Sequence, residues 1–226
     1  LEVAVDDAGH VVITARGQSV HASTPEDGHN ALWALAPMAR ALEIAPGGGR
    51  TMLELIDAEF RGDHFGERLG VGYSDTQMGR LSAAPTVLSI VDDAVHLRVN
   101  LRRPRGQSQA DFRASLTAAV SRLRERYGAE VQERESVYVG NPHFVDPAHE
   151  TVQAAIQVYQ ELTQEADIRP VSSRGSTYAR LFPGAISFGP SLPGRPYRGH
   201  GADEFMWIDA LDLQLNALWK ITQRLR

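Results

Sequence analysis

Three side chains in this sequence have the type and the setting needed for chemistry on an amide or carboxylate group. His21 stands among small residues in the stretch 17–25, Gly-Gln-Ser-Val-His-Ala-Ser-Thr-Pro. An imidazole placed there can donate a hydrogen bond to the oxyanion that forms when water attacks a carbonyl. Arg102 ends an alternating strand, where its guanidinium can hold a carboxylate bidentately. His200 lies in a glycine-flanked loop before a helix, where an imidazole has room to ligate zinc.

A further candidate is the segment Gly175-Ser176-Thr177, whose backbone N–H groups can meet a carboxylate at a helix start. Each candidate also has a simpler interpretation. The two histidines fit surface loops, the arginine fits a solvent-facing strand position, and the segment fits ordinary helix capping. The remaining histidines show no ligand spacing and are interpreted as surface or structural residues: His10, His29, His64, His96, His143 and His149.

Composition excludes several classes of protein. The 226 residues suffice for one large domain or two small ones, and 42% hydrophobic with 23% charged residues is typical of a globular chain. A net charge of −5 argues against nucleic acid as a partner. Without cysteine, disulfides and thiol nucleophiles are excluded. No apolar run approaches the ~18 residues of a membrane span, so we expect a cytoplasmic protein with no membrane partner.

The first part of the chain predicts a mixture of strands and helices. Residues 1–23 are expected to be extended, with a hairpin turn at Gly9. A helix is expected from Asp27 or Asn30 to Leu42, and a second over 52–60. The glycine-rich segment 61–80 is expected to be mostly irregular.

Two strands are then expected, over 86–91 and 94–102, and the second alternates strictly between apolar and polar residues. Ser108 is expected to cap a helix that closes at Gly128, and 129–139 is expected to return to strand. This order predicts an α+β sandwich with helices covering one face of an antiparallel sheet.

After Pro142 the pattern predicts strand–helix units cut from a larger sheet. We expect a helix from Asp146-Pro147 to Thr163 and a short buried strand over 185–188. A final helix is expected to begin near Asp209. Its expected inward residues are Leu211, Leu215, Leu218 and Ile221.

Several stretches together resemble the co-catalytic zinc peptidase superfamily, which includes carboxypeptidase G, aminoacylases, succinyl-diaminopimelate desuccinylase and the PepV-like dipeptidases. The order and spacing of these stretches match across nearly the whole chain, and the fourth looks closest to the PepV-like dipeptidases. They are Gly17-x-x-x-His21-Ala22-Ser23-x-Pro25 with Gly28-x-Asn30-Ala31; Leu97-x-Val99-Asn100-Leu101-Arg102; Pro142-His143-Phe144-Val145; Gly175-Ser176-Thr177-Tyr178-Ala179-Arg180; and Phe188-Gly189-Pro190 with Gly199-His200-x-x-Asp203-Glu204.

The resemblance implies a two-domain parent enzyme that hydrolyses a peptide or amide bond next to a free carboxylate. Residues 1–142 look like its lid, a ferredoxin-like dimerisation domain, and 143–226 look like the C-terminal α/β part of its catalytic domain. By the same resemblance, His21 steadies the oxyanion, Arg102 and the segment 175–177 bind substrate, and His200 ligates metal. The implied substrate is a dipeptide or an N-acylated amino acid, and the implied cofactor is a pair of zinc ions, with cobalt or manganese as alternatives.

The chain also departs from the superfamily pattern. It has no His-x-Asp pair and no Glu-Glu pair, so His200 is the only superfamily metal ligand with a counterpart here. We therefore expect the other ligands to lie upstream of Leu1, and expect this fragment alone to be inactive and to hold no zinc firmly. The alternatives are a non-catalytic module that homodimerises through the lid, and a ferredoxin-like nucleic-acid binder. The net negative charge opposes the second alternative.

Overall fold

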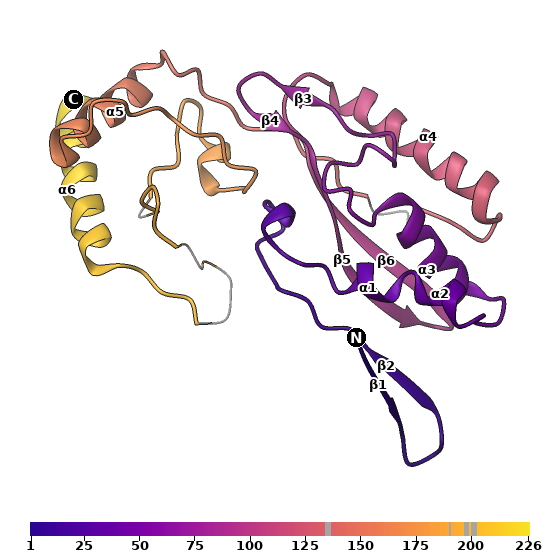
Figure 1. Ribbon diagram of the computed structural model, residues 1–226. Coiled ribbons are helices and arrows are strands. Elements are labelled where there is room, and N and C mark those ends of the chain that lie inside the picture. Colours follow the sequence, from indigo (N-terminus) through magenta and orange to yellow (C-terminus); the bar gives the residue numbers. More distant parts are fainter. Residues whose placement is uncertain (134–136, 190, 197–198, 200–202) are drawn as a thin grey trace. The chain divides into compact units, whose positions relative to one another are not determined.

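The computed structural model describes residues 1–133, 137–189, 191–196, 199 and 203–226. The chain divides into two compact units, Leu1–Pro142 and His143–Arg226 (Figure 1). The first unit contains β1 (Glu2–Val5), β2 (Val11–Thr14), η1 (Pro25–Asp27), α1 (Leu32–Leu35), α2 (Met38–Ala41), α3 (Gly48–Glu59), β3 (Ser74–Asp75), β4 (Gly79–Arg80), β5 (Ser82–Val91), β6 (Ala94–Arg102) and α4 (Gln109–Tyr127). The second contains α5 (Glu150–Thr163), η2 (Tyr178–Leu181) and α6 (Ile208–Arg224).

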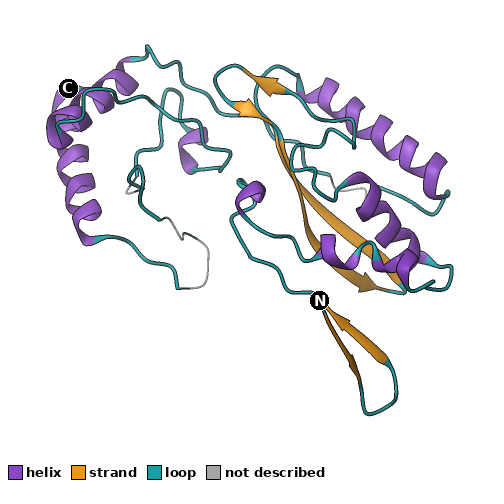
Figure 2. Cartoon of the chain, viewed as in Figure 1, coloured by secondary structure: helices purple, strands orange, loops and turns teal. Residues whose placement is uncertain are grey.

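The first unit is α+β, as the sequence predicts, but its strands form three separate antiparallel pairs (Figure 2). The pairs are β1–β2, β3–β4 and β5–β6, so the expected single sheet is not found among the described residues. One physical reason lies just after β2. The backbone groups of Gln18 and His29 bond to each other, at 2.9 and 3.0 Å, and close the intervening segment on itself. That segment therefore does not run on as a strand beside β6.

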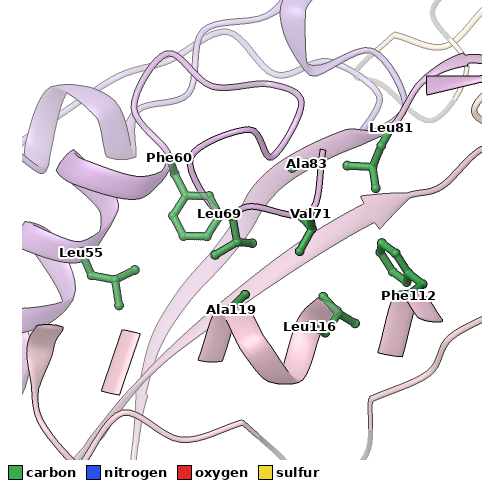
Figure 3. Close-up of a cluster of buried hydrophobic side chains, with 9 residues drawn as sticks. All are labelled: Leu55, Phe60, Leu69, Val71, Leu81, Ala83, Phe112, Leu116 and Ala119. Atoms are coloured by element: carbon green, nitrogen blue, oxygen red, sulfur yellow. The ribbon is translucent and has the colours of Figure 1, made fainter. Parts of the chain in front are cut away.

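The long hairpin β5–β6 carries the core of the first unit. Leu81, just before β5, and Ala83 within it lie in one cluster of nine buried residues with side chains from α3 and α4. Leu97, Val99 and Leu101 of β6 pack against this cluster, which explains the strict alternation of that strand. Figure 3 shows the nine side chains converging: Leu55, Phe60, Leu69, Val71, Leu81, Ala83, Phe112, Leu116 and Ala119.

Helix α4 begins and ends where its local sequence predicts. The hydroxyl oxygen of Ser108 accepts a hydrogen bond from the backbone N–H of Asp111 at 3.1 Å, which caps the first turn. Gly128 ends the helix with φ of 114°, a conformation that glycine adopts without steric strain. Phe112, Leu116 and Ala119 form its buried stripe, so the expected helix is confirmed.

The expected strand over 129–139 is wrong for the residues of that range that the structure describes. Instead of pairing with a strand, this segment bonds to the side chains of α4. The Arg124 guanidinium donates to the carbonyl of Val131 at 2.8 Å, and the Gln109 amide donates to the carbonyl of Val139. Since side chains satisfy these backbone acceptors, the segment needs no strand partner.

Two helix predictions differ from the structure at proline and glycine. The expected helix to Leu42 divides into α1 and α2 at Pro37, because proline has no N–H to donate to the preceding turn. Asn30 does support its start, since its side-chain oxygen accepts the N–H of Leu32 at 3.1 Å. The next helix begins earlier than expected, at Gly48 rather than Met52. Segment 61–80 is mostly irregular, as expected, and includes only the short pair β3–β4.

The second unit is built on the packing of α5 against α6. Its buried cluster contains Ala155, Val158, Ala217 and Ile221, with Ile186 and Phe188 packed against it. Of the residues expected to face inward on α6, only Ile221 is buried. Leu211, Leu215 and Leu218 are exposed by 41–59%. Because α6 has apolar residues on two opposite sides, the sequence pattern does not say which side meets α5.

The short strand expected over 185–188 is absent from the structure. These residues carry no regular secondary structure, although Ile186 and Phe188 are half-buried against the cluster between the two helices. A strand needs a neighbour for its backbone hydrogen bonds, and the described part of this unit contains no other strand. The apolar pattern therefore marks burial here without strand pairing.

Candidate functional site

The polar face of the β5–β6 hairpin lies on the side opposite the core. Ser82 pairs directly with Arg102, and Ala84 pairs with Asn100. Directly opposite residues share one face of a sheet, and Leu101 and Ala83 occupy the other face, toward the core. The Arg102 side chain therefore lies on the face of the hairpin away from the core, next to the Ser82 hydroxyl and the Asn100 amide.

Three buried polar atoms on this face have no hydrogen-bond partner among the described residues. They are Nε of Arg102, Oγ of Ser82 and Oδ1 of Asn100. Leaving such a group unpaired costs about 1–3 kcal/mol, and buried polar groups are paired in the large majority of cases. A donor on the guanidinium beside a hydroxyl that both donates and accepts can bind a polar ligand such as a carboxylate.

The neighbouring arginine differs sharply from Arg102. Arg103 donates from Nε to the carbonyl of Gly140 at 2.7 Å, and from its two terminal nitrogens to Gln107 and Asn141, each at 2.9 Å. Its guanidinium also lies 5.5 Å from the centre of the Phe112 ring. Arg103 is thus a structural residue that ties the start of α4 to the segment after it.

The loop between Gln18 and His29 holds His21 in a defined local geometry. The backbone N–H of Ser23 donates to Nδ1 of His21 at 3.3 Å, and the Ser23 hydroxyl lies 2.6 Å from the same nitrogen. A backbone N–H can only donate, so Nδ1 acts as the acceptor. The neutral ring then carries its proton on Nε2. Ser23 is only 7% exposed, which fixes the ring from one side.

Two glycines allow this loop to close on itself, and an asparagine holds it against β5. A Cβ atom on Gly17 would lie 2.2 Å from the carbonyl oxygen of His29, and one on Gly28 would lie 2.5 Å from Val20. The Asn30 amide donates to the carbonyl of Pro85 in β5 at 2.8 Å. The loop is therefore anchored on the same hairpin that carries Arg102.

His21 and Arg102 thus belong to the same part of the first unit, although no contact between them is described. Pro85, where the loop is anchored, pairs with Val99. Val99 precedes Arg102 by three residues, or about 10 Å along the strand. The loop that carries His21 is therefore anchored three residues along β6 from Arg102.

The segment 175–177 lies in the second unit and is engaged in local contacts. The Gly175 N–H donates to the Ser173 hydroxyl at 3.0 Å. Arg180 donates to the Ser176 hydroxyl at 3.0 Å, and the Thr177 hydroxyl lies 2.6 Å from that of Ser187. Thr177 precedes the four-residue helix η2 without a side-chain cap bond. Substrate binding by this segment stays a prediction.

His200 lies outside the described residues, so its metal-ligand role also stays a prediction. Across the described part of the chain, no three His, Asp or Glu side chains converge to hold a metal ion. The described residues therefore do not form a metal centre. None of the described helices is long and apolar enough to cross a membrane.

The structure adds two residues to the candidate site that sequence reasoning missed. Asn100 and Arg102 are two residues apart in the alternating strand β6, so they share a face. The sequence alternation alone is enough to predict this. Ser82 gave no such signal, because the expected strand began only at residue 86, whereas β5 begins at Ser82 itself.

Comparison with known proteins places the first unit in a family. Residues 7–128 match the peptidase dimerisation domain of M20 peptidases, which covers more than half of the chain. This match confirms the superfamily resemblance drawn from the motifs.

Three curated relatives align with nearly the whole chain. The putative dipeptidase YtjP of Bacillus subtilis (strain 168) is 29% identical over 221 residues, 96% of this chain and 44% of the relative. The Beta-Ala-Xaa dipeptidase of Lactobacillus delbrueckii subsp. lactis is 26% identical over 225 residues, 96% of this chain and 45% of the relative. The putative dipeptidase SH1171 of Staphylococcus haemolyticus (strain JCSC1435) is 25% identical over the same shares. The chain thus spans less than half the length of these relatives.

Proposed function

This chain belongs to the M20 peptidase dimerisation domain family, and we propose that it is a piece of a metal-dependent dipeptidase, the parent enzyme. Residues 1–142 form the lid, or dimerisation, domain, and 143–226 form the C-terminal portion of the catalytic domain. Support comes from relatives that align over 96% of the chain and are each called a dipeptidase. The division of the chain into two compact units after Pro142 fits the same assignment.

The proposed reaction is hydrolysis of a peptide or amide bond next to a free carboxylate, in a dipeptide or an N-acylated amino acid. Water adds to the scissile carbonyl carbon, the C–N bond breaks, and the leaving amine takes up a proton. In this proposal Arg102 binds the free carboxylate. The segment 175–177 of the second unit is proposed separately as a substrate-binding segment. His21 donates its Nε2 proton in a hydrogen bond to the oxyanion that forms on the carbonyl oxygen.

Metal ions belong to the parent enzyme in this proposal. Dipeptidases of this family are generally metal-dependent, and we propose two zinc ions, with cobalt or manganese as alternatives. His200 is the ligand that this chain contributes. Because the sequence has no His-x-Asp pair and no Glu-Glu pair, we expect the 226-residue chain alone to bind zinc weakly and to lack peptidase activity.

The observation that carries the proposal is the unpaired, buried Nε of Arg102 beside Ser82 and Asn100. The guanidinium of the neighbouring Arg103, by contrast, is paired through three of its nitrogens. A carboxylate would pair with the donor, and the Ser82 hydroxyl could donate to it as well. The family that matches this hairpin is one of peptidases, whose substrates carry such carboxylates.

The test is Arg102→Ala in the parent enzyme, assayed on a dipeptide and on the same dipeptide with its carboxylate amidated. We expect kcat/KM for the free dipeptide to fall at least about 100-fold, because a charge-assisted bidentate pair is lost. The amidated substrate should be affected little. Arg98→Ala is the matched control, since Arg98 lies on the same face of β6 but is exposed. Equal losses for both substrates would refute the carboxylate role.

A second function is supported by the family match itself, which names a dimerisation domain. In this alternative the first unit holds two copies of the chain together and has no part in chemistry. Sedimentation equilibrium of the 226-residue chain tests it. A concentration-independent monomer contradicts dimerisation through this chain, whereas a dimer supports it and leaves the Arg102 assay to decide the catalytic role.

A further inference from the structure

A small cavity on the helical side of the first unit is lined by three arginines. Its volume is about 200 Å³, and Arg68, Arg122 and Arg126 reach it from the loop after α3 and from α4. Glu59, at the end of α3, is the one carboxylate in its wall. The cavity thus combines three positive charges with one negative charge.

Each guanidinium is held in place by the fold. Arg68 donates to the carbonyl of Arg61 at 3.0 Å, and Arg122 donates to the carbonyl of Leu69 at 2.6 Å. Arg126 donates to Oε1 of Glu59 at 2.8 Å. These bonds use one nitrogen of each group, and a guanidinium carries five N–H donors. All three arginines are exposed to solvent, so each has N–H donors left for an anion, and the bonds to the fold reduce the ordering cost of binding.

The backbone is shaped to admit one of these groups. A Cβ atom on Gly70 would lie 2.5 Å from Nη2 of Arg122 and 3.2 Å from Cζ. Gly70 also has φ of +68°, which other residues adopt rarely. The missing side chain at Gly70 leaves the space in which the Arg122 guanidinium lies against the loop.

The single carboxylate is already engaged. Glu59 is 7% exposed, and its Oε1 accepts from both Arg126 and the Tyr127 hydroxyl, the latter at 3.0 Å. Glu59 therefore balances about one of the three arginines. The carbonyls at the C-terminal end of α3 would repel an anion, but Arg68 donates to two carbonyls in this region, those of Ala58 and Arg61.

We propose that this cavity binds a phosphate group, either free phosphate or the terminal phosphate of a small metabolite. A dianionic phosphate matches the surplus of two positive charges, and its oxygens accept several guanidinium N–H bonds together. The cavity is smaller than the 300–1,000 Å³ typical of drug-sized ligands, which suits a single phosphate group. Nothing in the dipeptidase reaction requires this site.

The experiment is isothermal titration calorimetry, in which inorganic phosphate is titrated into the full chain at pH 7.5 and constant ionic strength. We expect saturable binding in the millimolar range or tighter, and a loss of at least about 10-fold in affinity for Arg122→Ala. Arg122→Lys keeps the charge but loses the fork of donors, so it should bind with intermediate affinity. Arg98→Ala, on the other side of the hairpin, should bind as the unaltered chain does.

Glycerol phosphate, titrated in parallel, distinguishes the two sources of the phosphate. Tighter binding than free phosphate indicates a metabolite, and weaker binding indicates free phosphate. Circular dichroism without phosphate checks that each variant folds. If Arg122→Ala does not fold, Arg122→Lys carries the test. Binding that does not saturate, or that is equal in folded Arg122 variants and the unaltered chain, overturns the proposal.

Discussion

The two units of this chain differ in how completely they bury their apolar side chains. Among the described residues, the first has a cluster of nine buried side chains around α3, α4 and the β5–β6 hairpin, whereas the cluster between α5 and α6 of the second has four. Helix α6 also exposes Ile208, Leu215 and Trp219, by 79%, 59% and 67%. These positions lie on the side opposite Ala217 and Ile221, which meet α5. A helix that is apolar on two opposite sides is typical of one buried on both.

This difference indicates which unit can fold without the rest of the parent enzyme. A contiguous exposed apolar surface usually marks a contact with another protein surface. The second unit therefore has the pattern of a portion of a larger domain, which agrees with the proposal that it belongs to a catalytic domain. The first unit has the core of an independent module, although its β1–β2 hairpin also exposes valines at positions 3, 5 and 11.

The largest expected effect is on the core of the first unit. Phe112 is 3% exposed and packs near Tyr73, with ring centres 6.1 Å apart. Phe112→Ala should lower the free energy of unfolding of this unit by about 3–5 kcal/mol. Urea unfolding followed by Trp33 fluorescence, with the two tryptophans of the second unit replaced by phenylalanine, measures it.

The matched change in the second unit is Val158→Ala, because Val158 is fully buried between its helices. Its expected cost is smaller, about 2 kcal/mol, since fewer methyl and methylene groups are removed. Fluorescence of Trp207 and Trp219 in a Trp33→Phe background follows this unit. A cost below about 1 kcal/mol for Phe112→Ala would contradict the view that the first unit has a well-packed core.

The exposed side of α6 gives the next largest effect. Leu215→Ser should change the stability of the 226-residue chain by less than about 0.5 kcal/mol, because the side chain is 59% exposed there. In the parent enzyme the same change should cost about 2 kcal/mol, since we propose that the rest of the catalytic domain covers this face. Thermal unfolding of both proteins compares the two. Asn216→Ser, at an exposed position on a polar side of the same helix, is the control, and equal costs of Leu215→Ser in both proteins would contradict coverage.

The helix caps of α4 and α5 test the same difference between the two units, with smaller expected effects. Ser108→Ala removes the side-chain cap of α4 and should cost the first unit about 1 kcal/mol. His149→Ala removes the longer cap bond of α5, 3.2 Å from Nδ1 to the Thr151 N–H, and should cost the second unit less. The unit-specific fluorescence measurements above read both changes. Ser115→Ala within α4 should be neutral, because alanine favours helix, and a cost equal to that of Ser108→Ala would remove the capping argument.

The sequence predicts those elements whose signals are local. Ser108 and Gly128 mark the ends of α4 by their own side-chain and backbone chemistry, and alternation along β6 marks its two faces. The segment 129–139 has the same strand-like composition, but its described residues Val131 and Val139 bond to side chains of α4, because pairing depends on a distant partner. The predicted buried side of α6 is wrong for a related reason. Helical spacing of apolar residues does not distinguish between two apolar sides of one helix.

The candidate site likewise contains residues that local sequence predicts and residues that only the fold brings in. His21 and Arg102 could be named from residue type and motif order, whereas the orphaned hydroxyl of Ser82 depends on its register opposite Arg102. Register is set by the whole hairpin, including the shift between Pro85 and Val87. The three arginines of the helical cavity are spread over 59 residues of sequence, from 68 to 126, so only the folded chain brings them together.

The smallest expected effect is a pH dependence specific to the first unit. Burial, and then the adjacent Glu59 carboxylate, raise the pKa of Tyr127 to about 12, against about 10 in the unfolded chain. Between these values the unfolded state loses its proton while the folded state keeps it. Stability is therefore fully present below about pH 10 and is lost as the pH rises toward 12.

Tyr127→Phe should flatten this loss, and urea midpoints from Trp33 fluorescence between pH 9 and 11.5 measure it. Burial raises the pKa of Tyr73 as well, so the slope should shrink without vanishing. Tyr138→Phe, at a tyrosine that is 81% exposed in the same unit, should leave the slope unchanged. An unaltered slope in Tyr127→Phe would mean that the hydroxyl is neither buried nor held against Glu59. That result would also weaken the phosphate proposal. Without the bond to Tyr127, the Glu59 carboxylate could pair with more than one of the three arginines and reduce the positive charge of the cavity.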